Sequence, residues 1–466
     1  MIFSIEEVLS ATGGTLLQGG KDIFFGGIST DSRTINKGEL YFALQGSRFD
    51  GHHYALEALD KEAAGVVVEE EKARDIRWNG HQSKAIILVR DTVQALGDLA
   101  RERRRKYQTP VVALTGSNGK TTSKEMIAAC LETSFSVLKN RGNWNNLIGL
   151  PLTLLRLTEK ERVVVLEMGM NVPGEIRRLT EIAEPDVGLI TNIQKVHLEG
   201  LGSLERVKEE KGELFRRMKK DGTIVVNCDD SRVVGQAKEF SGQKITFGIE
   251  KPSDVMAGEI RLRGIKGTSF TLIFEGEETE ILLPLLGRQF VPDALSAVAI
   301  AALFGIDLER VKEVLEHFRS APMRMEVIPL QNGKTLINDA YNANPGSIEM
   351  ALETLAEVKG GGRAIAVLGD MLELGSFAEE AHLQLGRRVG ELSLDFLLAM
   401  GEWAPVVVAS AIRHGIEPER TRVLESHGDA ISLLRRVMQE GDWVLIKGSR
   451  RMAMEKVVEG LAEGRD

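Results

Sequence analysis

The stretch of sequence that decides the fold is VVALTGSNGKTT, residues 111–122. It opens with a mostly apolar run of strand length, and a segment of helical composition begins at about Lys120. Between them, Gly116 and Gly119 permit a tight loop whose backbone N–H groups can turn toward an anion at the helix N-terminus. A strand, a glycine-rich loop and a helix in this order predict a phosphate-binding loop.

The polar side chains of this loop indicate a nucleotide with its magnesium ion. Lys120 is placed to reach β- and γ-phosphates, and a threonine hydroxyl can hold the metal. Leu114 stands where the longer form of the pattern has its first glycine, so the loop is of the shorter GxxGKT type. The alternative, a turn with a chance Lys-Thr pair, does not explain the flanking strand and helix. The predicted nucleotide-binding residues of the loop are Gly116, Ser117, Asn118, Gly119, Lys120, Thr121 and Thr122.

The sequence after the loop repeats the strand and helix alternation. The apolar strands VVVLEMG, VGLITNI and TIVVNCDD alternate with helical segments, which predicts a parallel, doubly wound sheet. After Gly248, the segments EIRLRG, TSFTLIFEG and EILLPLLG predict an antiparallel appendage. Together these segments predict a central P-loop domain over residues 109–318.

The flanking regions predict two further α/β domains. Residues 1–108 alternate short apolar runs with turns and contain a predicted helix from Thr92 to Lys106, which indicates a small N-terminal domain. Residues 319–466 contain a second α/β series that predicts a Rossmann-like domain, with strands in TLINDAY, AIAVLGDM, DFLLAMGE, TRVLES and WVLIKGSR. The predicted fold class is therefore α/β in three domains, which fits a length of 466 residues.

Composition excludes several classes of protein. A net charge of -9 argues against a nucleic-acid partner, and the basic run at residues 101–106 is interpreted as a solvated helix end. Cys130 and Cys228 are too few for a disulfide framework and indicate a reducing compartment. The acidic N-terminal segment does not resemble a secretory signal, and the most apolar stretch is too short to cross a bilayer. We expect a cytoplasmic protein without integral membrane association.

Further polar residues follow the predicted strands of the central and C-terminal domains. Glu167 closes one strand and His197 follows another, so both could face nucleotide phosphates at the carboxyl edge of the sheet. Each alone also fits a structural role. Lys211, within a helical KEEKGELF segment, would ordinarily be a solvated helix lysine, and Asp339 is either a turn aspartate or an acceptor for ribose hydroxyls.

Taken in order, the motifs resemble the Mur ligases, and within them the UDP-N-acetylmuramoyl-tripeptide:D-alanyl-D-alanine ligase family. The resemblance covers essentially the whole chain. Its least common segments are YNANP, GDMLELG and KGSR in the C-terminal region. The other matching segments are DSR at 31–33, FDGH at 49–52, TGSNGKTT, NWNN at 143–146 with IGLPLTLL, EMGM, Asn192 with HLE at 197–199, KGE at 211–213 and RME at 324–326.

The resemblance implies that ATP phosphorylates the terminal carboxylate of UDP-N-acetylmuramoyl-tripeptide, and that the amine of D-alanyl-D-alanine attacks the acyl phosphate. The product would be the pentapeptide precursor of peptidoglycan. It implies ATP and two Mg²⁺ ions as cofactors, with a carbamylated lysine at Lys211. Lys120, Lys211 and His197 would be catalytic. The metal-binding groups would be Thr121, Glu167, His197 and Lys211.

The resemblance also assigns substrate contacts, and we expect the enzyme to be a monomer. Asp31, Ser32 and Arg33 would seat the UDP end on the first domain, while Arg324 and Asp339 would reach the nucleotide from the third. Tyr341, Asn342 and Asn344 would line the cleft near the dipeptide. The remaining predicted substrate residues are Asp50, His52, Asn145 and Lys447.

One segment departs from the family pattern. Where the family usually has Gly-x-His-Asn-x-x-Asn, the chain reads GRQFVPD at 287–293. Gln289 stands in place of the histidine, and Phe290 and Asp293 replace the two amides expected near the adenine and the cleft. Asn338 and Ala340 also differ from the residues usual beside Asp339. Alternative functions are a folylpolyglutamate or cyanophycin synthetase type of ligase, a P-loop ATPase coupled to a partner, and a non-catalytic nucleotide-binding module.

Overall fold

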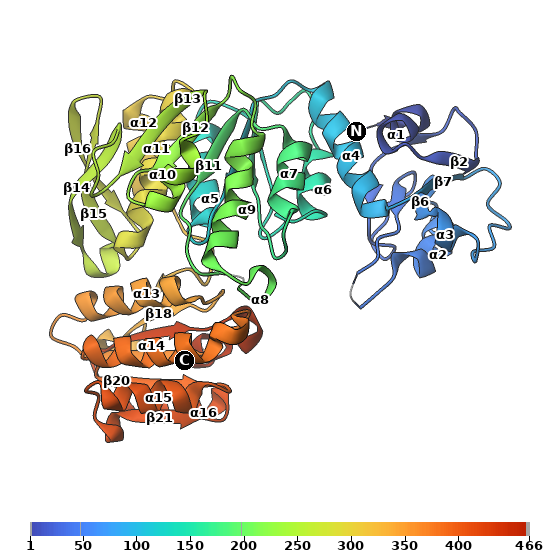
Figure 1. The fold of residues 1–466 in the computed structure, drawn as a ribbon. Coiled ribbons are helices and arrows are strands. Elements are labelled where there is room, and N and C mark those ends of the chain that lie inside the picture. The colour runs from blue at the N-terminus through green and yellow to red at the C-terminus, as the bar shows by residue number, and fades with distance from the viewer. Residues whose placement is uncertain (1, 47, 197, 463–466) are drawn as a thin grey trace.

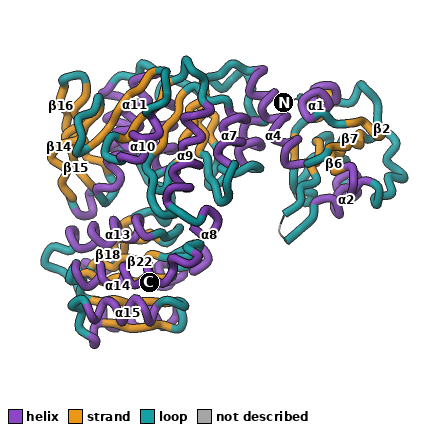
Figure 2. Tube along the Cα trace, viewed as in Figure 1, coloured by secondary structure: helices purple, strands orange, loops and turns teal. Residues whose placement is uncertain are grey.

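The computed structural model of the chain describes residues 2–46, 48–196 and 198–462 (Figure 1). Three α/β units follow one another along the chain, each built around its own sheet. The central unit lies between the first unit and the C-terminal unit, and Figure 2 shows strands flanked by helices in all three. The predicted α/β fold class is confirmed.

The first unit has a five-stranded sheet in the order β2-β7-β6-β5-β4 and a separate pair, β1-β3. Strands β4 to β7 run parallel, and β2 is antiparallel to β7. The elements are β1 (Phe3–Ser4), α1 (Ile5–Thr12), β2 (Thr15–Gln18), β3 (Phe24–Phe25), β4 (Ile28–Ser29), β5 (Leu40–Phe42), α2 (Ala55–Asp60), β6 (Gly65–Glu69), α3 (Glu70–Ala73), β7 (Ala85–Val89) and α4 (Thr92–Lys106).

The central unit has a nine-stranded sheet in the order β16-β15-β14-β13-β12-β11-β8-β10-β9. Its elements are β8 (Val111–Thr115), α5 (Lys120–Glu132), β9 (Val137–Lys139), α6 (Gly149–Leu154), β10 (Val163–Glu167), α7 (Glu175–Ala183), β11 (Val187–Ile190), α8 (Leu198–Leu201), α9 (Leu204–Arg217), β12 (Thr223–Asn227), α10 (Ser231–Ala237), β13 (Gln243–Gly248), β14 (Val255–Leu262), β15 (Thr268–Phe274), β16 (Glu277–Leu283), α11 (Val291–Leu303) and α12 (Leu308–Glu316). Strands β8 to β14 are parallel, and β14 to β16 form the predicted antiparallel appendage.

Strand β8 is apolar throughout because both faces of the sheet are covered. Val112 and Leu114 join the core that contains α5 and α11, whereas Val111 and Ala113 join the core that contains α7 and α9. The strand therefore holds the loop at its carboxyl end on a support packed from both sides.

The C-terminal unit has a six-stranded sheet in the order β17-β18-β22-β19-β20-β21, parallel except for the edge strand β17. Its elements are β17 (Glu326–Pro329), β18 (Thr335–Asp339), α13 (Pro345–Val358), β19 (Ala364–Gly369), α14 (Ala378–Glu391), β20 (Phe396–Met400), α15 (Ala404–Arg413), β21 (Thr421–Leu424), α16 (His427–Val437), β22 (Trp443–Lys447) and α17 (Glu455–Ala462). Helix α13 lies on the side of this unit that faces the central unit (Figure 1).

The basic run in α4 is only in part the solvated helix end that the sequence predicted. Arg105 and Lys106 are exposed, whereas Arg103 and Arg104 are each 4% exposed. Arg103 donates to the carbonyl of Leu157 at 2.8 Å, and Arg104 pairs with Asp186 at 2.8 Å. The prediction was wrong for these two arginines because their acceptors lie far along the chain, where no local pattern reveals them. Arg103 and Arg104 connect the first unit to the central unit.

The structure also describes the state of the two cysteines and the apolar character of the helices. Both cysteines are free thiols, Cys130 buried and Cys228 partly exposed. Within the described residues, none of the helices combines the length and apolar character needed to cross a bilayer.

Candidate active site

The glycines of the phosphate loop are required by close contacts at its back. Gly119 has φ 80°, and a Cβ there would lie 2.3 Å from Oδ1 of Asp293. A Cβ on Gly116 would lie 1.8 Å from Oγ1 of Thr191. Such approaches are shorter than any side chain tolerates, so only glycine lets this loop sit between β11 and α11.

The segment that follows β11 holds the phosphate loop through hydrogen bonds. Thr191 donates to the carbonyl of Asn118 at 2.6 Å, and the Asn118 N–H donates to Oδ1 of Asn192 at 2.9 Å. Ser117 exchanges hydrogen bonds with the main chain of Gln194. The loop is thus shaped before any nucleotide arrives, which lowers the entropy cost of binding.

Two lysines share one carbonyl acceptor of the loop. Lys120 Nζ donates to the carbonyl of Gly116 at 2.8 Å and to that of Ser117 at 3.2 Å. Lys211 Nζ, from α9, donates to the same Gly116 carbonyl at 2.8 Å and is 2% exposed. The alternative of a solvated helix lysine at 211 is therefore wrong. Burial lowers the pKa of Lys120 and holds that of Lys211 well below its usual range, and the neighbouring Lys120 lowers Lys211 further.

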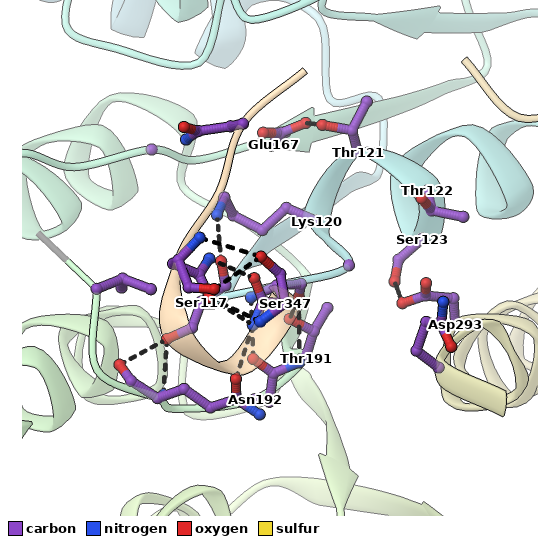
Figure 3. A pocket seen from close by; sticks show the side chains of 18 of the residues that line it. Ser117, Lys120, Thr121, Thr122, Ser123, Glu167, Thr191, Asn192, Asp293 and Ser347 are labelled. Carbon is purple, nitrogen blue, oxygen red and sulfur yellow. Dashed lines mark hydrogen bonds between the residues drawn. The ribbon is translucent and has the colours of Figure 1, made fainter. Parts of the chain in front are cut away.

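Glu167 ends β10 opposite the first turn of α5, and its carboxylate is held from two sides. Thr121 Oγ1 donates to Oε2 at 3.0 Å (Figure 3). Asn145 Nδ2 donates to Oε1 at 2.7 Å. The buried ammonium of Lys124 lies 4.0 Å from Oε2. A carboxylate and a hydroxyl next to a phosphate loop are oxygen ligands of the kind Mg²⁺ takes, so the residues present fit that ion.

A buried carboxyl lies on the other side of the loop. Asp293, at the start of α11, is 5% exposed and accepts a hydrogen bond from Ser123 Oγ at 2.7 Å (Figure 3). Burial raises its pKa to about 7, although the hydrogen bond from Ser123 and the positive charge of Arg324 work in the opposite direction.

The C-terminal unit reaches the loop through Arg324. Its guanidinium stacks on Tyr341 at 4.2 Å and approaches Thr121 Oγ1 at 3.4 Å. The two neighbours of Arg324, Met323 and Met325, have φ values of 62° and 48°. Left-handed backbone at two non-glycine residues is strained, and such strain commonly marks a segment whose geometry serves function.

Asp339 and Lys447 end two adjacent strands, β18 and β22, and form an ion pair. Lys447 is 2% exposed and also donates to the carbonyl of Asn342 at 3.1 Å. Asp339 accepts the N–H of Met325 at 3.1 Å. This pair ties the strained segment to the sheet edge from which the predicted YNANP motif begins.

These residues line one cleft of about 750 Å³ between the central and C-terminal units. The predicted residues in its lining are Ser117, Asn118, Gly119, Lys120, Thr121, Thr122, Asn145, Glu167, Lys211, Arg324, Asp339, Tyr341, Asn342, Asn344 and Lys447. Residues from strands far apart in sequence thus meet at the carboxyl edges of both sheets, as ligand sites in open α/β sheets do.

The predicted substrate residues of the first unit lie outside this lining. Arg33 is exposed and pairs with Asp31 at 2.7 Å, and Ser32 is buried. His52 is buried, with Nδ1 2.6 Å from Asp50 and Nε2 accepting the Glu69 N–H. The contact of these residues with substrate stays a prediction.

Part of the predicted metal site cannot be located, because His197 lies outside the described residues. Within the described ranges, there is no group of three or more histidine, cysteine, aspartate or glutamate side chains placed to hold a metal. The roles of Thr121, Glu167 and Lys211 toward a metal therefore stay predictions.

Several supporting residues were not predicted from the sequence. Lys124 lies one helical turn after Lys120 and is fully buried beside Glu167, and that spacing was the available signal. The side chain of Asn140 makes two hydrogen bonds to the main chain of Glu167. It donates to the Glu167 carbonyl at 2.9 Å and accepts a hydrogen bond from the Glu167 N–H at 3.0 Å. No local pattern identifies Asn140, since its partner lies in a different strand.

Comparison with protein families matches three Mur ligase models along the chain. The family models described as "Mur ligase family, catalytic domain", "Mur ligase middle domain" and "Mur ligase, glutamate ligase domain" match residues 25–104, 114–301 and 323–450. The match therefore includes parts of all three units, and it places the chain in the class of Mur ligases.

Comparison with individual proteins indicates which of the Mur ligases the chain is similar to. The chain is 36% identical to the UDP-N-acetylmuramoyl-tripeptide–D-alanyl-D-alanine ligase of Bacillus subtilis, over 94% of this chain and 93% of that protein. A crystal structure of MurF from Acinetobacter baumannii superposes with a TM-score of 0.89 at 31% identity, covering 99% of both chains. MurF from Thermotoga maritima in complex with ADP gives 0.83 at 28% identity, covering 94% of this chain and 97% of that one.

The chain belongs to the Mur ligase family and, within it, to the UDP-N-acetylmuramoyl-tripeptide–D-alanyl-D-alanine ligases. It is therefore a ligase of peptidoglycan precursor synthesis.

Proposed function

We propose that the cleft uses ATP to activate the terminal carboxylate of UDP-N-acetylmuramoyl-tripeptide and transfers the acyl group to D-alanyl-D-alanine. The observation that carries this proposal is the convergence of Lys120 and Lys211 on one loop carbonyl, with Glu167 and Arg324 beside them. Activation is needed because a carboxylate is a poor electrophile. A carboxylate oxygen attacks the γ-phosphorus and ADP leaves; the amine then attacks the acyl carbon, and phosphate and a proton leave.

Charge neutralisation is the main task of the residues around the loop. The γ-phosphate and the substrate carboxylate are both anions, and they repel each other on approach. Lys120 provides a cation under the loop, and Arg324 provides a second one from the C-terminal unit. Because these groups are already held in place, they stabilise the developing charge with little rearrangement.

Thr121, Glu167 and His197 are the residues we propose for magnesium. The ion would supply Lewis-acid polarisation of the phosphoryl oxygens when bound. Asn145 and Lys124 hold the Glu167 carboxylate in position, so its oxygens face the cleft without prior rearrangement.

We propose that Lys211 is carbamylated. Two amines that share one carbonyl acceptor in a buried site repel each other if both are protonated. The depressed pKa of Lys211 favours its neutral form, whose nitrogen can attack carbon dioxide, forming a C–N bond and releasing a proton. The resulting carbamate anion would be attracted to Lys120 and could serve the second magnesium ion.

The first unit would hold the UDP end of the substrate through Asp31, Ser32, Arg33, Asp50 and His52. The residues that would face the dipeptide come from the C-terminal unit and are Tyr341, Asn342, Asn344 and Lys447. Nucleotide contacts from the C-terminal unit would come from Arg324 and Asp339. A cytoplasmic location and a monomeric state stay predictions. Because the product is a precursor of peptidoglycan, we also propose a role in cell shape and cell division.

The test is phosphate release by the purified chain with ATP and magnesium, with each of the other two substrates added singly and together. Release that needs both, with formation of UDP-N-acetylmuramoyl-pentapeptide by mass, is the expected result. Release without either would instead support the coupled ATPase. Normal turnover with a carboxylate that lacks UDP would support the folylpolyglutamate or cyanophycin type.

A further inference from the structure

The tip of the phosphate loop is hydrogen-bonded to the first turn of α13, across the boundary between the central and C-terminal units. Asn344 Nδ2 donates to Oδ1 of Asn118 at 2.7 Å. Asn118 Nδ2 lies 3.5 Å from Oδ1 of Asn344, at the limit of a hydrogen bond. The two asparagines therefore face each other amide to amide, although 226 positions separate them in the chain.

The side chain of Asn118 is also held from the central unit. Its Nδ2 donates to Oε1 of Gln194 at 2.7 Å, in the segment that follows β11. Its main-chain N–H and carbonyl are bound by Asn192 and Thr191. Asn118 is thus the residue of the loop at which contacts from both units meet.

Asn344 has a second role that fixes the orientation of its amide. Its Oδ1 accepts the N–H of Ser347 at 2.9 Å, and Ser347 Oγ accepts the N–H of Asn344 at 3.1 Å, which together cap α13. With the oxygen used by the cap, the NH₂ group is turned toward Asn118. The helix start and the interunit contact therefore depend on one side chain.

The backbone of α13 also approaches the central unit closely. A Cβ on Gly346 would lie 2.1 Å from Oε1 of Gln194 and 3.5 Å from Nδ2 of Asn118. A larger residue would force Gln194 aside. Glycine in a helix is otherwise unfavourable by propensity, and at this position it leaves room for the side chain of Gln194.

We propose that Asn344 is a positioning residue that makes the order of the phosphate loop depend on the placement of the C-terminal unit. Arg324 and Tyr341 come from that same unit, so the loop is fully held only when the second half of the cleft is present. This inference rests on the proposed function in one respect, since it predicts that phosphoryl transfer is fastest when Asn344 is in contact with Asn118. A loop held from both units would limit loss of the acyl phosphate to water.

The first test is hydrogen exchange of the loop amides at 116–122 in the full-length Asn344→Ser variant. Serine caps a helix nearly as well as asparagine but is too short to reach Asn118. We expect these amides to exchange about fivefold faster than in the unsubstituted chain, as the loss of one modest hydrogen bond implies. Ser426→Ala is the matched control, because it removes the cap of α16 in the same unit and lies outside the cleft lining. Unchanged exchange in Asn344→Ser would overturn the proposal.

The second test is a double-mutant cycle on kcat/KM with Asn118→Ala and Asn344→Ser. We expect each single change to lower kcat about fivefold with KM for ATP within about twofold, and the double variant to be little worse than either. Strictly additive losses would show that Asn118 and Asn344 act independently of each other, and would overturn the proposal. Gly346→Ala is the second variant, since it improves helix propensity while displacing Gln194, and it should lower kcat in the same way. If the unsubstituted chain forms no pentapeptide, the proposed function fails while the exchange experiment still decides the contact.

Discussion

The carboxyl edge of the central sheet and the motif loops of the first unit both carry charged residues in short motifs, but they hold those charges differently. At the sheet edge, the side-chain nitrogens of Lys120 and Lys211 donate hydrogen bonds to main-chain carbonyls. In the first unit, Arg33 pairs with Asp31, and Lys72 pairs with Asp50 at 2.6 Å. The hydrogen bond from Arg33 lowers the pKa of Asp31 to about 2, so this pair is ionised at any ordinary pH.

The sheet edge of the central unit and the loops of the first unit differ in how many existing ionic contacts must break before an anion can bind. Lys120 donates to main-chain carbonyls, so its charge stays available and little is lost when a phosphate displaces an acceptor. An arginine already paired with a carboxylate must exchange one anion for another, and an exposed pair contributes little energy to begin with. Loss of a central lysine should therefore affect the reaction strongly, whereas loss of Arg33 should affect one substrate weakly.

The largest effect is expected for Lys120→Ala. Removing the cation beneath the loop should lower kcat by on the order of 10³-fold, because transition-state charge loses a fixed partner. The fold should persist, since the loop remains held by Thr191, Asn192 and Asp293. Initial-rate assays together with circular dichroism test this, and near-normal turnover would mean that the loop is misassigned.

Lys211→Ala should lower activity by on the order of 10²-fold, as expected for a group that acts through a bound metal. If Lys211 is carbamylated, short carboxylic acids should restore part of the activity by replacing the missing anion. Enzyme prepared free of bicarbonate should show the same deficit before carbon dioxide is returned. Full activity of both preparations would exclude the carbamate and leave Lys211 as a structural amine.

Asp293→Asn tests the carboxyl on the other side of the loop through the pH dependence of stability. Between the ordinary pKa of 3.8 and the folded value of about 7, the folded chain keeps a proton that the unfolded chain releases. Stability of the unsubstituted chain therefore falls as pH rises through this window, by up to roughly 1.4 kcal/mol per pH unit, and levels off above it.

The amide at position 293 has no such proton to release. The variant should therefore unfold at a higher temperature than the unsubstituted chain at pH 8, and the difference should nearly vanish at pH 4. Calorimetric scans at both pH values measure this. An equal difference at pH 4 and pH 8 would show that Asp293 does not titrate in this range.

The sequence predicted the parts of the site that depend on local geometry. Gly116 and Gly119 between an apolar strand and a helix identified the loop, because only that backbone permits its contacts. The helix at 92–106 was predicted to the residue. The sharing of one carbonyl by Lys120 and Lys211 could not be predicted, since it depends on how α9 packs beside β8. The burial of Arg103 and Arg104 was missed for the same reason, as their partners belong to another layer of the fold.

The smallest effect is expected for Arg33→Ala, which tests the other side of the comparison. Arg33 is exposed and its pair with Asp31 is screened by solvent, so the change should leave thermal stability almost unaltered. If the first unit seats the UDP end, KM for UDP-N-acetylmuramoyl-tripeptide should rise about tenfold through the loss of one charged hydrogen bond, with KM for ATP within about twofold. Arg261→Ala is a matched control, since Arg261 is also exposed and pairs with a nearby carboxylate, that of Glu259, in the appendage. A larger rise in KM for ATP than for the UDP substrate would remove the first unit from substrate binding and make its charged pairs purely structural.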